Sequence, residues 1–332
     1  MAVLVTYTPR KQEKSVEFLS LNDVRMKVLI ATEKPFAKVA VEGITKILKG
    51  AGIEAVLLEK YTDKADLLKA VADVEGIIIR SDKVTAEVVA AAPKLKIVVR
   101  AGAGYDNVDL AACTAKGIVV MNTPGQNSNA VAELAIGMMI FMARNKFLPG
   151  TGTEISGKNL GIHAYGNVGS LVGKYGKAMG MNVFAFDPFV ADKGIFARDG
   201  VTEVASVEEL YSKCDYVSLH IPATDKTKKS IGFALLSRMP KGATLVNTAR
   251  KEVIDEEGLI KVLTERADLK YVSDIAADLQ VVLDEKFPAR VFATEKKMGA
   301  ETAEANINAG LAAARQTVGF LIDGDRKFQV NK

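Results

Sequence analysis

Short runs of β-branched and other apolar residues alternate with helix-like segments along most of the chain. From Met26 onward, stretches whose apolar positions recur with the period of a helix separate these runs, a pattern typical of parallel sheets with crossover helices. Helices of a first series are expected to begin near Ala40, Lys64 and Thr85, and a long apolar helix over residues 129–144 follows. The expected strands of this series cover residues 28–31, 54–58, 76–79, 97–99 and 118–121.

A second alternating series begins after the long helix. A last apolar helix is expected over residues 302–321. This order predicts an α/β protein with two doubly wound parallel-sheet domains, one a Rossmann-type nucleotide domain and the other a flavodoxin-like substrate domain. Ligands should bind in the cleft between the domains, at the carboxyl ends of the strands. The expected strands of the second series cover residues 160–163, 182–186, 216–219, 243–247 and 270–273.

Composition narrows the class of protein. The chain has 332 residues, of which 48% are hydrophobic and 25% are charged, enough for two domains that each have a core. The net charge of +4 is spread along the sequence, whereas nucleic-acid-binding proteins usually carry a basic stripe with interleaved aromatic residues. The apolar segment 130–143 is too short to span a bilayer and contains Glu133. We therefore expect a protein that binds neither nucleic acid nor a membrane.

The cysteines and the start of the chain bear on the compartment. Cys113 and Cys214 lie far apart and outside any spacing that binds a metal. Two unpaired thiols, and a start without a basic segment followed by an apolar stretch, favour a cytoplasmic protein with no metal site. Residues 1–25 differ in pattern from the rest, so we treat them as an N-terminal extension and assign them no function.

A turn between a strand and a helix, from Leu160 to Gly169, is similar to the G-x-G-x-x-G fingerprint of dinucleotide-binding domains, with Ala164 in place of the first glycine. Asp187 ends the next strand, 18 residues after Gly169. An acidic side chain there accepts a hydrogen bond from the ribose 2′-hydroxyl and repels a 2′-phosphate, which favours NAD over NADP. The alternative is a packing turn in a protein that binds something else. The expected cofactor contacts in the turn are Tyr165, Gly166, Asn167 and Val168.

Four blocks of sequence carry a more specific likeness. They are Arg100-Ala-Gly-Ala-Gly-Tyr-Asp-Asn-Val-Asp109, Asn122-Thr-Pro-Gly-Gln-Asn-Ser-Asn-Ala-Val-Ala-Glu133, Ser218-Leu-His-Ile-Pro-Ala-Thr224, and Asn247-Thr-Ala-Arg250 with Val253-Ile-Asp-Glu-Glu257. In this order they resemble the D-isomer-specific 2-hydroxyacid dehydrogenase family. The likeness spans about Met26 to the C-terminus and is closest to the short-form 3-phosphoglycerate dehydrogenases within that family.

The resemblance implies a domain organisation and an assembly. The substrate-binding domain would be discontinuous, over residues 26–121 and 302–332, and the NAD-binding Rossmann domain would cover residues 122–301. It also implies a homodimer with the helix over residues 129–144 and its surroundings at the interface, although a core helix would have the same composition.

The resemblance further implies a site for an anionic substrate. Arg250 would grip a 2-oxo acid through two hydrogen bonds and polarise its carbonyl group. Ala103 and Gly104 lie in a glycine turn whose backbone N–H groups can bind a carboxylate. In the loop after the strand over 76–79, three polar residues could hold a phosphate, although a solvated loop would look the same. These three are Arg80, Ser81 and Lys83, and the further expected cofactor contacts are His220, Pro222, Thr248 and Asp274.

One departure from the family pattern concerns the acid–base group. The family uses a histidine, oriented by a glutamate, whereas the matching stretch here is Thr294-Glu-Lys-Lys-Met-Gly-Ala300. Lys297 takes the place of the histidine, with Lys296 as the alternative, and Asp278 is a possible remnant of the acidic partner. A lysine can serve if burial and neighbouring positive charges lower its pKa from about 10.4. Members with a lysine at this position are known in the family.

Three functions remain open at this stage. The favoured one is NAD-dependent oxidation of 3-phosphoglycerate to 3-phosphohydroxypyruvate, the step that opens serine biosynthesis, with a phosphorylated 2-hydroxy acid as the substrate. The second is a glyoxylate or hydroxypyruvate reductase of the same family, which needs less positive charge near Arg80 and Lys83. The third is a catalytically idle NAD-sensing protein. The absence of the family's histidine and glutamate would favour this function.

Overall fold

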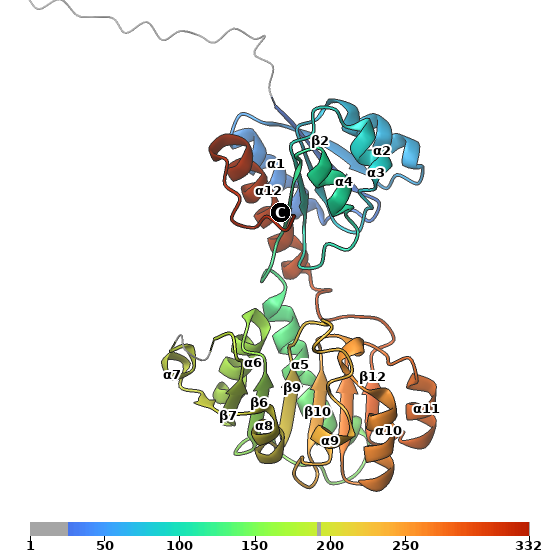
Figure 1. Ribbon diagram of the computed structural model, residues 1–332, viewed down its shortest axis with the longest axis vertical. Helices are drawn as coiled ribbons and strands as arrows, with labels where there is room; N and C mark the ends of the chain where they lie inside the picture. Colours follow the sequence, from blue (N-terminus) through green and yellow to red (C-terminus); the bar gives the residue numbers. More distant parts are fainter. Residues whose placement is uncertain (1–25, 191–193, 332) are drawn as a thin grey trace, which may run out of the picture.

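The computed structural model describes residues 26–190 and 194–331, which form two α/β units joined end to end (Figure 1). The extension expected over residues 1–25 lies outside the described residues. The first unit contains a five-stranded parallel sheet in the order β2-β1-β3-β4-β5. Its strands are β1 (Lys27–Thr32), β2 (Glu54–Glu59), β3 (Gly76–Ile79), β4 (Ile97–Arg100) and β5 (Val119–Asn122).

The second unit contains a seven-stranded parallel sheet in the order β12-β11-β10-β9-β6-β7-β8. The strand order reverses between β6 and β9, and in doubly wound sheets this switch point opens a crevice for ligands at the carboxyl ends of the strands. The strands are β6 (Asn159–His163), β7 (Asn182–Phe186), β8 (Thr202–Glu203), β9 (Tyr216–Leu219), β10 (Thr244–Asn247), β11 (Lys270–Ser273) and β12 (Val291–Ala293). Every strand expected from the sequence is present, and β8 and β12 are additional. The predicted fold class is therefore confirmed.

Helices cover both faces of each sheet. In the first unit they are α1 (Lys38–Gly50), α2 (Lys64–Ala70), α3 (Ala86–Ala91) and α4 (Leu110–Ala115). In the second they are α6 (Asn167–Ala178), α7 (Ile195–Asp199), α8 (Val207–Lys213), α9 (Phe233–Leu236), α10 (Glu256–Glu265) and α11 (Gln280–Lys286). Short 3-10 turns lie at Val71–Asp73, Asn145–Phe147 and Lys251–Val253.

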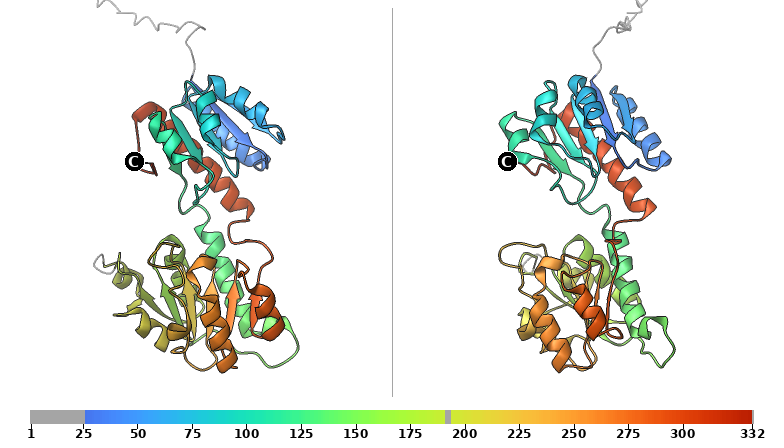
Figure 2. Two further views of the ribbon diagram at one scale, coloured as in Figure 1. Left: turned by 45° about the vertical axis from the view of Figure 1, so that its right-hand side comes forward. Right: turned by 90° about the vertical axis from the view of Figure 1, so that its right-hand side faces the viewer.

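Two long helices begin where the chain passes between the units. Helix α5 (Ser128–Ala143) packs against α6, β10 and β11 of the second unit. Helix α12 (Ala303–Asp323) returns to the first unit and packs against α1, β3 and β4 (Figure 2). The first unit is thus built from both ends of the described chain. This arrangement is compatible with the predicted domain organisation. The exact residue boundaries of the two domains stay a prediction.

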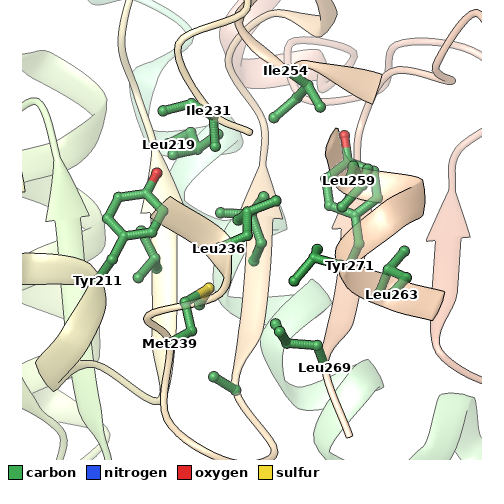
Figure 3. Close-up of a cluster of buried hydrophobic side chains, with 14 of the residues drawn as sticks. Tyr211, Leu219, Ile231, Leu236, Met239, Ile254, Leu259, Leu263, Leu269 and Tyr271 are labelled. Carbon is green, nitrogen blue, oxygen red and sulfur yellow. The ribbon is translucent and has the colours of Figure 1, made fainter. Parts of the chain in front are cut away.

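Buried apolar side chains fix the strand ends that carry polar residues. The cluster in Figure 3 packs α8, α9 and α10 against one face of the second sheet and includes Tyr211, Leu236 and Tyr271. A second cluster packs α5 and α6 against the opposite face. Burying each large apolar side chain contributes about 1.5–3 kcal/mol, so the central strands β9, β10 and β11 are held firmly on both faces. Residues that directly follow these strands therefore have well-defined positions.

Candidate active site

A cavity of about 600 Å³ lies where the carboxyl ends of the two sheets face each other. The first unit contributes the turn after β4, and the second contributes the turn between β6 and α6 and the segments that follow β9 and β10. The start of α5 and the segment before α12 complete the lining. The sequence placed the ligand site at this position in the fold.

The turn between β6 and α6 has the shape that a dinucleotide needs. A β-carbon at Gly169 would lie 2.2 Å from the carbonyl oxygen of Ala164, so only glycine permits this close contact of helix and strand. A β-carbon at Gly166 would meet no atom within 4 Å, which leaves open space beside the start of the helix. Gly166, Asn167 and Val168 line the cavity, as expected for residues that bind a pyrophosphate.

Ala164 occupies the left-handed region with φ of 76°. An L-residue with a β-carbon pays about 1–2 kcal/mol for this conformation, whereas glycine does not. Ala164, which stands in place of the first glycine of the fingerprint, therefore has a strained backbone conformation. Tyr165 follows it, but its ring is buried against Phe196 and its hydroxyl donates to Asp199 at 3.2 Å. Tyr165 was expected to contact the cofactor, and only its backbone remains available for that contact.

Asp187 follows β7 and organises the same turn. Its carboxylate accepts hydrogen bonds from the backbone N–H groups of Tyr165 and Phe189, both at 2.8 Å. The side chain is largely buried, and each carboxylate oxygen has a further lone pair for a ribose hydroxyl. Asp187 is not one of the residues that line the cavity. It could therefore contact only the adenosine end of a dinucleotide that extends beyond the cavity.

Three expected cofactor contacts from the other strand ends, His220, Pro222 and Thr248, line the cavity. The Thr248 hydroxyl is buried and has no hydrogen-bond partner among the described residues. A buried hydroxyl without a partner costs stability unless a ligand or water satisfies it. Burial lowers the pKa of His220 to about 3, so its imidazole is neutral at pH 7 and contacts the Ser218 hydroxyl at 3.0 Å. The residues present therefore fit a bound NAD.

The remaining histidine is structural. His163 ends β6, and its Nδ1 lies 3.4 Å from the hydroxyl of Tyr211. Burial lowers its pKa to about 4. It is not among the cavity-lining residues, which agrees with its expected place in the interior.

Lys297 and Arg250 both line the cavity, as does Arg100 from the first unit. The pKa of Lys297 is held below that of an ordinary lysine, first by partial burial and then by the positive charge of Arg250. Arg100 acts in the same direction, whereas the carboxylates of Asp274 and Glu252 raise this pKa. The amine of Lys297 thus lies near two arginines in the cavity.

Asp274 was expected to contact the cofactor. Its side chain is fully buried after β11 and is not among the cavity-lining residues. The carboxylate accepts hydrogen bonds from the N–H groups of Met298 and Gly299, both at 2.8 Å, and from the Thr294 hydroxyl at 3.2 Å. Asp274 therefore holds the loop that carries Lys297.

Asp278, the suggested remnant of the acid–base partner, has its contacts at the surface. Its exposed carboxylate forms an ion pair with Lys251. Its backbone N–H donates to Glu256 at 2.9 Å. The structure records no contact between Asp278 and Lys297. The suggestion that Asp278 is a remnant of the acid–base partner is therefore not supported by its position.

The loop after β3 contributes less to the cavity than expected. Arg80, Ser81 and Lys83 are not among its lining residues. The Arg80 guanidinium donates to Asn306 at 2.6 Å and lies 3.9 Å from the carboxylate of Glu301, which does line the cavity. Arg80 thus contacts a cavity-lining residue without lining the cavity itself.

Ala103 and Gly104 line the cavity, as expected, and Arg100 joins them. Arg100 begins one of the family-like motifs, but no role was expected for it from the sequence. Its position at the carboxyl end of a buried strand was the available signal. Its Nε donates to the carbonyl oxygen of Arg80 at 3.0 Å, which links the two arginines.

Three further observations concern membrane spans, metal sites and cysteines. Within residues 26–190 and 194–331, no helix is long and apolar enough to cross a membrane. The same residues contain no cluster of three or more histidine, cysteine, aspartate or glutamate side chains that could hold a metal ion. Both cysteines are buried free thiols.

Comparisons with known proteins agree with the geometry. Residues 137–290 match the model of the D-isomer specific 2-hydroxyacid dehydrogenase NAD-binding domain. The crystal structure of NAD+-bound 3-phosphoglycerate dehydrogenase from Entamoeba histolytica is 49% identical and covers 93% of this chain and 99% of that chain, with a TM-score of 0.80.

Curated relatives point the same way. D-3-phosphoglycerate dehydrogenase of Methanocaldococcus jannaschii is 38% identical over 68% of this chain and 45% of that protein. Hydroxypyruvate reductase of Thermotoga maritima is 36% identical over 62% of this chain and 70% of that protein. The chain spans about half the length of the first of these relatives. The second unit is the NAD-binding domain of this family, and the chain belongs to the D-isomer specific 2-hydroxyacid dehydrogenases.

Proposed function

We propose that the protein oxidises 3-phosphoglycerate to 3-phosphohydroxypyruvate with NAD, the step that opens serine biosynthesis. The observation that carries the proposal is the shared lining of one cavity by Lys297, Arg250 and Arg100 beside the dinucleotide turn. The relatives with phosphoglycerate activity in their names, from Entamoeba histolytica and Methanocaldococcus jannaschii, support the choice of substrate.

The cofactor supplies a nicotinamide ring that accepts hydride from C2 of the substrate. Gly166, Asn167 and Val168 would bind its pyrophosphate, and Asp187 its adenosine ribose. Thr248 offers a hydroxyl without a partner among the described residues, and His220 and Pro222 form the wall beside it. The carboxylate of Asp187 supports NAD over NADP, because a 2′-phosphate would meet its negative charge.

Arg250 would bind the carboxylate of the substrate and polarise the C2 oxygen. Its guanidinium donates to the carbonyl oxygen of Ala249 at 2.8 Å, and the remaining N–H groups are available to a ligand. The backbone N–H groups around Ala103 and Gly104 would bind the same carboxylate from the first unit.

Lys297 would be the acid–base group. In the direction of oxidation its neutral amine removes the proton of the C2 hydroxyl, and its lowered pKa makes that form more abundant. In the direction of reduction its ammonium form returns the proton to the carbonyl oxygen. Lys296 adjoins it in the sequence, and both residues have solvent-exposed surface, but only Lys297 lines the cavity, which favours Lys297 over Lys296.

The phosphate would be bound by arginines of the first unit. Arg100 lines the cavity, and its Nε donates to the backbone carbonyl oxygen of Arg80. Ser81 and Lys83 are exposed on the same loop and would contribute if the loop moved toward the substrate. The positive charge of Arg80 acts on Arg100, and two such guanidinium groups suit a dianionic phosphate better than an uncharged hydroxymethyl group.

A hydroxypyruvate reductase is the second candidate. The Thermotoga maritima relative with that name matches this chain over 70% of the relative's length. NADH absorbance followed in parallel with 3-phosphoglycerate, phosphohydroxypyruvate, hydroxypyruvate and glyoxylate separates the two. A kcat/KM for the phosphorylated pair at least tenfold above that for the others supports our assignment. Preference for hydroxypyruvate or glyoxylate would refute it, and activity with none would indicate an NAD-sensing protein.

We also propose a cytoplasmic homodimer. The buried free thiols Cys113 and Cys214 suit a reducing compartment. Most apolar side chains of α5 are buried within the chain itself, but Phe147 and Leu148, just beyond the helix, are exposed. These two side chains are the best candidates for a dimer contact. Light scattering of the wild type and of a Phe147→Ser, Leu148→Ser variant would test this, with a monomeric wild type as the contrary result.

A further inference from the structure

Asp274 anchors the loop that carries Lys297. The carboxylate of Asp274 receives three hydrogen bonds from this loop, two from the N–H groups of Met298 and Gly299 and one from the Thr294 hydroxyl. These donors lie on both sides of Lys297 in the sequence. The anchor therefore controls the direction in which the loop presents the amine.

The burial of Asp274 makes this anchor strong. Its side chain has no exposed surface, so no bulk water replaces a lost partner. A buried carboxylate is destabilising unless hydrogen bonds compensate it, so the loop and the carboxylate depend on each other. Backbone N–H groups that donate to a carboxylate form bonds roughly twice as strong as neutral ones.

The packing around Gly299 is a second, independent sign of the same fit. A β-carbon at this position would lie 2.9 Å from Oδ2 of Asp274 and 3.2 Å from a methyl group of Val131 on α5. Only glycine therefore allows the loop to approach both the carboxylate and α5 this closely. The loop is held between the end of β11 and α5.

Charged groups from several elements face Lys297. Arg250 follows β10, Arg100 ends β4, and both lower its pKa, as partial burial does. Asp274 and Glu252 raise it. Glu301 and Asp106 also line the cavity. The amine keeps its lowered pKa only while the loop holds it among these groups.

We propose that Asp274 is the positioning residue for Lys297 and takes over, through the backbone of the loop, the orienting task that a glutamate performs for the family's histidine. The inference rests on the proposed role of Lys297 as acid–base. It differs from the cofactor contact expected at Asp274, because every recorded hydrogen bond of the carboxylate goes to the loop.

Asp274→Asn tests the proposal, with Asp278→Asn as the matched control. Asparagine has only one acceptor oxygen, so its NH2 group would face one of the two backbone N–H groups of the loop. Two donors cannot bond to each other, so the loop should be released. We expect kcat to fall roughly 10- to 100-fold, as misplacing a catalytic group by about 1 Å does. The dissociation constant of NADH, measured from its fluorescence, should change less than about threefold, since the nucleotide turn is untouched. Asp278→Asn, which alters an exposed ion pair with Lys251, should match the wild type.

A second readout needs neither turnover nor cofactor. Trace labelling of the cofactor-free protein with acetic anhydride across a pH series, followed by mass spectrometry, reports the pKa of Lys297, with Lys296 as internal reference. Burial and Arg250 are the two largest influences on Lys297, and both lower its pKa. Release of the loop removes both, so the midpoint for Lys297 should rise toward that of Lys296.

The outcomes are distinct. A lower midpoint in Asp274→Asn would mean that only a charge was lost while the loop stayed in place, which overturns the positioning role. An unchanged midpoint with NADH binding weakened tenfold would mean that Asp274 contacts the cofactor. If Asp274→Asn does not fold, Gly299→Ala displaces the same carboxylate and should raise the midpoint and lower kcat. The labelling result stands even if Lys297 is not the acid–base, so the two hypotheses fail separately.

Discussion

The guanidinium of Arg100 folds back over the backbone of Gly102, so closely that a β-carbon at residue 102 would lie 1.5 Å from Nη1. Gly102 itself has φ of 150°, a conformation that L side chains rarely adopt. The position of an arginine in the candidate active site thus depends on a missing side chain two residues later. Burial is the main influence that lowers the pKa of Arg100.

Gly102→Ala should therefore displace Arg100 and weaken binding of the phosphorylated substrate. Losing charge-assisted hydrogen bonds worth about 1.5–3 kcal/mol corresponds to a fall in kcat/KM of roughly 10- to 150-fold. Gly117→Ala is the control, because Gly117 also has a positive φ but its β-carbon would meet no atom within 4 Å. Equal effects of the two variants on kcat/KM would contradict the dependence of Arg100 on Gly102.

Lys297→Met should abolish turnover in both directions while NADH binding persists. General acid–base groups contribute about 10²- to 10⁴-fold to the rate, and methionine keeps the length of the side chain without a titratable amine. Lys296→Met is the control and should retain near wild-type activity, because Lys296 is exposed outside the cavity lining. A Lys297→Met rate above about a tenth of the wild-type rate would exclude Lys297 as the acid–base.

The rate of oxidation should rise with pH as Lys297 loses its proton, and the rate of reduction should fall. Because partial burial and Arg250 lower the pKa of Lys297, the midpoint should lie below that of a free lysine. In Arg250→Gln one of these influences is removed, so the midpoint should move to higher pH in the labelling experiment on cofactor-free protein. A midpoint unmoved by Arg250→Gln would show that the two side chains are not electrostatically coupled.

Ala164→Gly should stabilise the protein. Ala164 has φ of 76°, and glycine removes a strain of about 1–2 kcal/mol, partly offset by the greater flexibility of glycine in the unfolded chain. We expect a higher midpoint of thermal unfolding and little change in NADH affinity, because the cavity-lining atoms of Gly166 are unaffected. A lower unfolding temperature would mean that packing of the Ala164 methyl group outweighs the strain.

Most of the fold could be predicted because buried parallel strands are apolar on both faces and stand out in the sequence. The two missed strands show where this signal ends. β8 spans only Thr202–Glu203 and β12 only Val291–Ala293. Segments of two or three residues at the edges of a sheet are too short to show a period.

The candidate site was less predictable where long-range contacts decide the direction of a side chain. The sequence placed Asp274 at a strand end, but it could not show that Met298 and Gly299, far along the chain, donate hydrogen bonds to its carboxylate. Tyr165 lies in the fingerprint, yet packing against Phe196 turns its ring inward. Arg100 stood at the start of a recognised motif, but its role depends on how its side chain folds over Gly102.

The return of α12 to the first sheet makes the two units unequal in a way that can be exploited. The second unit is one uninterrupted stretch of chain, in effect an insert within the first, and its two ends both lie at the crossing between the units. Two cuts at this crossing would therefore separate it from the first unit. The first unit can be obtained alone only by splicing α12 to the end of β5 through a short linker.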